Sequence, residues 1–162
     1  MPRIARVCAV GYPHHITQRG NNKEKVFFDD EDRRLYLDIL QRYKNKYGIK
    51  ILAYCLMGNH VHILVVPGQE MSLARAMGGT NLVYTQHVNR KYHRSGRLWQ
   101  NRFFSSVVEE EPYLWAVMRY MEQNPVRAKL VKKAEDYPWS SARAHVLGME
   151  DDILSKENWF KE

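Results

Sequence analysis

The sequence has few cysteines and no long hydrophobic run. Its two cysteines, Cys8 and Cys55, lie far apart and form no Cys-x-x-Cys motif, which argues against a disulfide framework or a zinc knuckle. No stretch approaches the roughly 18 apolar residues that a membrane-spanning helix needs. Residues 1–6 also lack the apolar core of a signal peptide. We therefore expect a cytoplasmic protein with no membrane partner.

What the chain does contain is an excess of positive charge on a globular composition. It holds 25 Lys and Arg against 18 Asp and Glu in 162 residues, which gives a net charge of +7, a pI of about 9.4 and a mean hydropathy of −0.56. This length suits one domain with one core. A positive surface concentrates polyanions, and nucleic acid is the usual one. Charge alone, however, does not separate a nucleic-acid-binding protein from other basic proteins.

The hydrophobic pattern predicts the element order β-α-β-β-α-β, followed by further helices. Strands are expected at 14–18, 49–57, 60–66 and 103–108, and helices at 29–47, 71–93 and 109–124, with a short helix after Pro138. Gly78 and Gly79 fall inside the second helix, where each costs about 1 kcal/mol relative to alanine, so we expect a kink or break there. The order predicts a ferredoxin-like α+β fold, an antiparallel sheet with helices on one face. One domain should span residues 1–148 and 149–162 should form a C-terminal tail, of which the final dozen residues should be loosely packed.

A His-x-His pair opens the third predicted strand. Side chains alternate along a strand, so His60 and His62 point to the same face, roughly 7 Å apart, and can share one metal ion. Such a pair alone is more often just two tolerated histidines. A later helix strengthens the metal interpretation, because Tyr120 and Asn124 lie one turn apart on one of its faces, at roughly 5–6 Å. Two imidazoles and an amide oxygen would leave coordination positions open and favour Mg²⁺ or Mn²⁺ over zinc.

Three neighbouring side chains compete to be the third ligand. At about 100° per residue, Asn124 lies about 40° from Tyr120 around the helix axis, and Gln123 lies about 60° away on the other side. Glu122 is about 160° away and should face away from the site. Geometry alone therefore separates Asn124 from Gln123 only narrowly.

The densest basic stretch runs from residue 87 to residue 102 and is interleaved with Tyr92, Trp99 and Phe103. It is either a solvated helix face or a phosphate track with aromatic side chains on which unpaired bases stack. On the second interpretation, the predicted DNA-binding residues are Arg19, Arg90, Lys91, Arg94, Arg97, Trp99, Arg102 and Arg127.

Five segments resemble the single-tyrosine HUH transposases, and within them the REP-associated tyrosine transposases. They are residues 12–21 (YPHHITQRGN), 57–64 (MGNHVHIL), 98–103 (LWQNRF), 119–128 (RYMEQNPVRA) and 137–141 (YPWSS), in order over about residues 10–148. The resemblance implies the HUH nuclease fold and a divalent cation, Mg²⁺ or Mn²⁺, held by His60, His62 and Asn124. It also implies that Tyr120 attacks a phosphodiester in single-stranded DNA, leaving a 5′-phosphotyrosine and a free 3′-hydroxyl.

The same resemblance implies a substrate and a setting. The substrate would be single-stranded or imperfect hairpin DNA of the REP kind, and the protein would be prokaryotic, nucleoid-associated, and a monomer or homodimer. Two alternatives stay open: a catalytically silent DNA-binding regulator of the same fold, and a metal nuclease that uses water. His14 and the Gly78-Gly79 pair depart from the family pattern, the first where many relatives have an aromatic residue.

Overall fold

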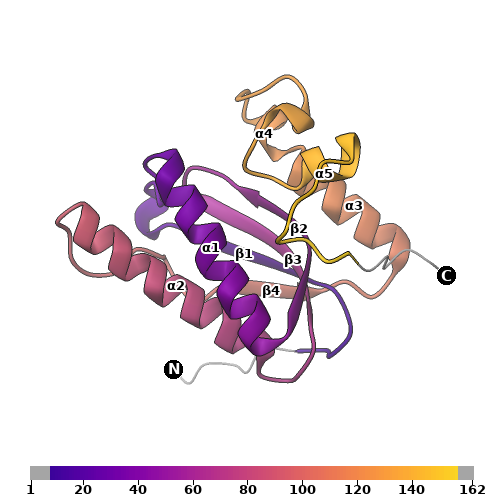
Figure 1. Ribbon diagram of the computed structural model, residues 1–162, viewed down its shortest axis with the longest axis horizontal. Helices are drawn as coiled ribbons and strands as arrows, with labels where there is room; N and C mark the ends of the chain where they lie inside the picture. Colours follow the sequence, from indigo (N-terminus) through magenta and orange to yellow (C-terminus); the bar gives the residue numbers. More distant parts are fainter. Residues whose placement is uncertain (1–7, 157–162) are drawn as a thin grey trace.

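The computed structural model describes residues 8–156 and contains a four-stranded antiparallel sheet (Figure 1). The strands, in the spatial order β2-β3-β1-β4, are β1 (His14–Arg19), β2 (Ile49–Leu56), β3 (His60–Pro67) and β4 (Phe104–Val107). The helices are α1 (Asp30–Tyr47), α2 (Ser72–Lys91), α3 (Glu111–Glu122), α4 (Asn124–Arg127) and α5 (Ala142–Leu147), with single turns η1 (Asn21–Lys23) and η2 (Ala134–Asp136). The predicted ferredoxin-like α+β fold is confirmed.

Local signals in the sequence explain where the first elements begin and end. The Asp29 side chain accepts a hydrogen bond from the Asp32 amide and caps α1, and Gly48 ends that helix with a left-handed backbone at φ 67°. Between β2 and β3, the Met57 amide donates to the His60 carbonyl at 2.9 Å and closes a turn over Gly58 and Asn59. The predicted hairpin therefore places His60 at the first position of β3.

Helix α2 runs without interruption through Gly78 and Gly79, so the predicted kink or break was wrong. A Cβ atom at Gly79 would lie 2.4 Å from Cε1 of Tyr43 on α1. The glycine allows α1 and α2 to approach each other closely, and the packing gained there offsets its low helix propensity.

The helices divide between the two faces of the sheet. Helices α1 and α2 run side by side over one face (Figure 1), where Ile63 and Val65 of β3 join the main core. Helix α3 covers the opposite face and packs on Leu64 and Val66. The prediction of helices on one face therefore holds for α1 and α2 but not for α3. The reason is that β3 is central and apolar on both sides, so both faces need cover.

The final dozen residues, expected to be loosely packed, are packed against the domain as far as residue 155. Ile153 is buried in the main core, and the Asp151 carboxylate accepts a 2.6 Å hydrogen bond from the Tyr54 hydroxyl. The Ser155 amide donates to the Ile51 carbonyl at 2.8 Å. Residues 1–7 of the predicted domain and 157–162 of the predicted tail lie outside the described residues. None of the helices between residues 8 and 156 has the length and hydropathy of a membrane span.

Candidate active site

The two histidines of β3 lie on the face of the sheet that α3 covers. In the antiparallel pairing of β1 with β3, His60 is opposite Arg19 and His62 is opposite Thr17. The imidazole ring centroids of His60 and His62 are 5.0 Å apart. The predicted same-face arrangement of the pair is therefore confirmed.

Both histidines use their Nδ1 atoms within the protein. The Asn59 side-chain oxygen lies 2.6 Å from Nδ1 of His60, and because that oxygen only accepts, Nδ1 carries the proton. Nδ1 of His62 lies 3.0 Å from Nε2 of His15. When His62 donates in this pair, both β3 histidines present an unprotonated Nε2, the arrangement that is usual for metal-binding histidines.

His15 and Asn59 were not among the site residues predicted from the sequence. His15 lies on the same face of β1 as Thr17, diagonal to His62, so the contact depends on the register between β1 and β3. A His-x-Thr alternation on a strand that pairs with the His-x-His strand would have been the signal. That pairing is known only once the sheet is assembled.

Burial keeps the two β3 histidines neutral. The pKa of His60 is lowered to about 4 and that of His62 to about 3, chiefly by burial, with the positive charge of Arg19 contributing at both. For His62, the neighbouring His15 and His60 rings and Arg127 act in the same direction. At neutral pH both imidazoles are therefore in the uncharged form that binds metal ions.

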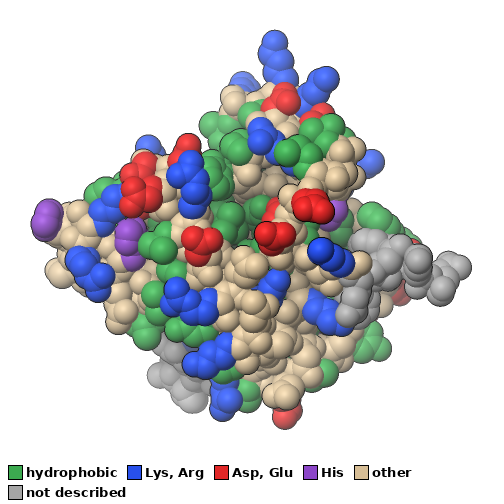
Figure 2. Space-filling model, in the orientation of Figure 1, with side chains coloured by type: hydrophobic (Ala, Val, Ile, Leu, Met, Phe, Trp, Pro, Cys, Tyr) green, Lys and Arg blue, Asp and Glu red, His purple; other side chains and the backbone are tan. Residues whose placement is uncertain are grey.

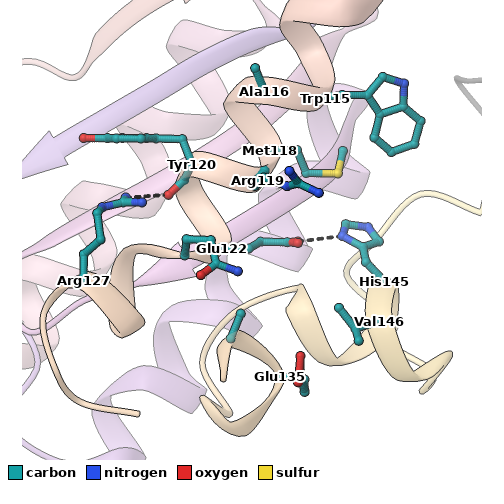
Figure 3. Close-up of a pocket in the computed structure, with 12 residues that line it drawn as sticks. Trp115, Ala116, Met118, Arg119, Tyr120, Glu122, Arg127, Glu135, His145 and Val146 are labelled. Carbon is teal, nitrogen blue, oxygen red and sulfur yellow. Dashed lines mark hydrogen bonds and ion pairs between the residues drawn. The ribbon is translucent and has the colours of Figure 1, made fainter. Parts of the chain in front are cut away.

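Tyr120 reaches this site from α3. Its ring centroid lies 6.4 Å from that of His62, with the two rings perpendicular, and the residue is 55% exposed. The Arg127 guanidinium carbon sits 4.1 Å from the centroid of the Tyr120 ring, and Arg127 also donates to the Tyr120 carbonyl at 2.6 Å (Figure 3). The predicted nucleophile is thus accessible, next to the histidines and held by a cation.

The three candidate third ligands differ in their surroundings. Glu122 is buried and accepts hydrogen bonds from the Ser141 hydroxyl and from Nδ1 of His145, so it faces away from the histidines, as helix geometry predicted. Gln123 lines a cavity of about 1110 Å³ that Glu122 and His145 also line (Figure 3). Asn124 does not line that cavity. Asn124 is half-buried, and its role as the third ligand stays a prediction.

The helix that carries Tyr120 was predicted to end at Asn124, but it ends earlier. Helix α3 ends at Glu122, and Asn124 begins the short helix α4 ahead of Pro125. Between residues 8 and 156, no three His, Cys, Asp or Glu side chains are placed to hold a metal ion together. A third protein ligand beside His60 and His62 would therefore be of another type, and an amide fits that requirement. Two neutral imidazoles with Nε2 available and a nearby amide fit a divalent cation such as Mg²⁺ or Mn²⁺.

Two of the predicted DNA-binding residues are committed elsewhere. The Lys91 ammonium lies 2.9 Å from the Asp29 carboxylate and 3.1 Å from that of Asp32, and these carboxylates raise the pKa of Lys91. Trp99 is only 7% exposed and packs with Tyr36 in the main core. Lys91 is therefore paired with acidic groups and Trp99 has little exposed surface, so the structure does not favour a DNA contact at either residue, and the two assignments stay predictions.

The other predicted cations are spread over the molecule. Arg94 donates to the Asn89 side chain at 2.7 Å, and Arg97 donates to the Gln100 carbonyl at 3.1 Å, so both hold the loop before β4. Arg90 lies on α2, on the other face of the sheet from the histidines, and Arg102 precedes β4. Figure 2 shows basic and acidic side chains interspersed on the side that carries α1. The predicted DNA-binding cations whose charge acts on His62 are Arg19 and Arg127.

Comparisons with known proteins identify the family and the fold. A family model described as "Transposase IS200 like" matches residues 8–124. A Haemophilus influenzae protein named as a REP-associated tyrosine transposase is 21% identical over 147 residues, which cover 80% of this chain and 84% of that protein. The solved structure of a REP-associated tyrosine transposase bound to a REP hairpin superposes with a TM-score of 0.76 at 17% identity, covering 97% of this chain and 93% of the other. At that identity the superposition shows a shared fold.

Proposed function

Since this chain belongs to the IS200-like transposase family, we propose that it is a metal-dependent, single-tyrosine DNA transposase that cuts and rejoins single-stranded or hairpin DNA. The motif resemblance to REP-associated tyrosine transposases is confirmed by the family match and by the relatives. The observation that carries the finer proposal is the position of Tyr120, exposed and beside two neutral histidines.

The proposed reaction exchanges one phosphate ester for another. The Tyr120 oxygen loses its proton to solvent and attacks the phosphorus as the bond from phosphorus to the 3′-oxygen breaks. The phosphate at the 5′ end of the downstream fragment is then esterified to Tyr120, and the released 3′-oxygen takes up a proton to become a hydroxyl. A divalent cation, when bound by His60, His62 and Asn124, would polarise the phosphate and stabilise its developing charge. Because one ester replaces another, the step is reversible and rejoining needs no ATP.

Arg127 is placed to assist the nucleophile. A phenol has a pKa near 10 and must lose its proton to attack. The Arg127 guanidinium over the Tyr120 ring favours the negative charge that forms there, and its hydrogen bond to the Tyr120 carbonyl fixes the guanidinium relative to α3.

Three observations support DNA as the substrate. The net charge is +7, and the related solved structure is described as bound to a REP hairpin. The 1110 Å³ cavity adjoins Tyr120 and is lined in part by Arg119 and Trp115, a cation and an aromatic ring of the kinds that contact single strands (Figure 3).

The covalent intermediate provides the test. A pool of hairpin oligonucleotides with single-stranded flanks, labelled at the 3′ end, is incubated with the protein and Mn²⁺ and resolved on a denaturing gel. We expect a labelled protein band from the wild type and none from Tyr120→Phe, with DNA affinity nearly unchanged because only the attacking oxygen is lost. The matched control is Tyr113→Phe, since Tyr113 lies on the same helix and is 56% exposed.

Each contrary result has a definite meaning. An adduct that persists in Tyr120→Phe would assign the attack to another tyrosine. Cleavage without any adduct would support the water-using nuclease, and DNA binding without cleavage would support the silent regulator.

A further inference from the structure

A second polar cavity, of about 420 Å³, lies where β1 ends. Its lining consists of four amide side chains and two cations: Asn21, Asn22, Lys23, Arg97, Gln100 and Asn101. None of the four amides belongs to the site described above. Each amide carries a hydrogen-bond donor and an acceptor, the combination that matches the edges of nucleobases.

The backbone around this amide-lined pocket is held in an unfavourable conformation. Asn22 and Lys23 have positive φ angles of 56° and 59°, which cost on the order of 1 kcal/mol or more for residues with a side chain. The Lys23 amide donates to the Gly20 carbonyl at 3.0 Å. A Cβ atom at Gly20 would lie 2.2 Å from the Glu24 carbonyl oxygen, so only glycine permits this turn. Such strain persists where the surrounding structure fixes it, and it is common at binding sites.

Two loops are joined to make the pocket. The backbone N–H of Asn21 donates to the Leu98 carbonyl at 2.9 Å, and the backbone N–H of Gln100 donates to the Arg19 carbonyl at 2.8 Å. These two bonds fix the loops relative to each other, and with them the side-chain amides that line the pocket.

One side chain connects the pocket to the candidate metal site. Asn59 donates from its amide nitrogen to the Lys23 carbonyl at 3.2 Å, and its amide oxygen accepts from Nδ1 of His60 at 2.6 Å. The Gly20 amide also donates to the Asn59 carbonyl at 2.8 Å. Asn59 therefore links the turn that carries Lys23 directly to the His60 ring.

We propose that the amide-lined pocket binds an unpaired nucleotide adjacent to the phosphodiester that Tyr120 attacks. The amides of Gln100 and Asn101, with those of η1, hydrogen-bond the edge of the base, and Lys23 and Arg97 face its phosphate. The inference rests on the proposed function and deepens it, because it gives the protein a place to select one base without reading a duplex.

A binding experiment tests this without cleavage. The full chain carrying Tyr120→Phe selects strands from a randomised single-stranded DNA pool, and the bound strands are sequenced. We expect enrichment of a particular base at one or two unpaired positions. When Gln100→Ala and Asn101→Ala are added, the enrichment of the preferred base should fall roughly ten-fold, the scale of an amide–base contact. The total affinity for DNA should change less than about two-fold.

The matched control is the pair Gln69→Ala and Asn45→Ala. These exposed amides flank Gly48 and Gly68, at the opposite end of β3 from His60, and should leave the base preference unchanged. A separate variant, Lys23→Gly, keeps the positive φ and removes the charge. This variant should weaken binding to all DNA sequences alike and reduce the slope of log affinity against log salt concentration by about 0.7.

The outcomes separate this inference from the proposed function. If the wild type forms the covalent adduct but the Gln100→Ala/Asn101→Ala protein keeps the full base preference, the pocket proposal is wrong and the nuclease proposal stands. If no adduct forms but the preference depends on these amides, the pocket stands and the nuclease chemistry falls. A Tyr120→Phe protein that enriches no base also overturns the pocket proposal.

Discussion

The two faces of the sheet share the same strands but carry different kinds of side chain. Beneath α1 and α2, Tyr36 and Tyr84 are fully buried, with ring centroids 5.3 Å apart and the rings perpendicular, edge to face. Beneath α3, the apolar cluster around Leu64 gives way to His60 and His62 near the start of β3. Alternation along a single strand thus directs apolar residues to one face and, over its first three positions, metal-binding residue types to the other.

This difference separates stability from chemistry. The α1/α2 face excludes water and packs large aromatic rings, which stabilise the fold through burial and edge-to-face contacts. The α3 face buries His62, leaves His60 partly exposed and keeps Tyr120 accessible. Substitutions on the two faces should therefore fail in different assays.

The largest expected effect is on the α3 face. His62→Ala removes one of two imidazoles and should abolish detectable cleavage and Mn²⁺ binding, while the thermal midpoint changes little because the apolar residues of β3 remain. Calorimetric titration with Mn²⁺ and the adduct assay measure the two losses. His93→Asn is the control, since His93 is exposed with a φ of 53° that asparagine tolerates. Full cleavage by His62→Ala, or by the wild type in EDTA, would refute the metal hypothesis.

Substitutions on the face covered by α1 and α2 should instead lower the stability of the fold. Tyr84→Ala removes a fully buried ring that contacts Phe27 and Tyr36, and it should cost about 3–5 kcal/mol of unfolding free energy. Urea denaturation measures that loss. Molecules that stay folded should bind Mn²⁺ with wild-type affinity. A folded Tyr84→Ala protein with weakened Mn²⁺ binding would show that the two faces are not independent.

Local patterns in the sequence were sufficient to predict the elements and the central features of the site. Apolar periodicity gave the βαββαβ order, the Gly58-Asn59 turn gave the hairpin, and strand alternation placed His60 and His62 together. The proximity of Tyr120 to His62 followed from the family resemblance, and the geometry now supports it. The role of Asn124 as a metal ligand stays a prediction.

Features that depend on contacts between distant segments could not be predicted in this way. The His15–His62 contact needs the β1/β3 register, and Gly79 is explained only by Tyr43 on a neighbouring helix. Lys91 looked like a free cation because Asp29 and Asp32 are about sixty residues away along the chain. Composition shows which charges exist, whereas only the fold shows which of them are already paired.

A smaller effect should separate His15 from the residues that would bind metal directly. Through its contact with Nδ1 of His62, His15 orients the ring and directs Nε2 outward. His15→Leu should weaken Mn²⁺ binding about 10–100-fold, as the loss of such an outer partner commonly does. His15→Gln, whose amide oxygen can accept from Nδ1, should recover part of the affinity. Equal Mn²⁺ affinity in the wild type and His15→Leu would leave His15 with a packing role only.

The smallest effect is a dependence of stability on pH that originates on the α3 face. Burial lowers the pKa of His62 from 6.5 to about 3, with His15, His60, Arg19 and Arg127 contributing in the same direction. Between these two values the unfolded chain binds a proton that the folded protein does not. Stability is therefore lost as the pH falls from about 6.5 toward 3, and this histidine contributes nothing to the pH dependence above about pH 7.

At roughly 1.4 kcal/mol per pH unit, the loss from His62 between pH 7 and pH 5 is at most about 2 kcal/mol. Urea unfolding in EDTA at the two pH values measures it. His62→Gln cannot titrate, so this variant should lose less stability than the wild type over the same interval, whereas Tyr84→Phe, on the other face, should keep the wild-type dependence. If His62→Gln and the wild type lose the same amount, the folded protein already accepts a proton at His62 near pH 5. The ring would then not be neutral by burial, and the argument that it is ready to bind a metal ion would lose its electrostatic support.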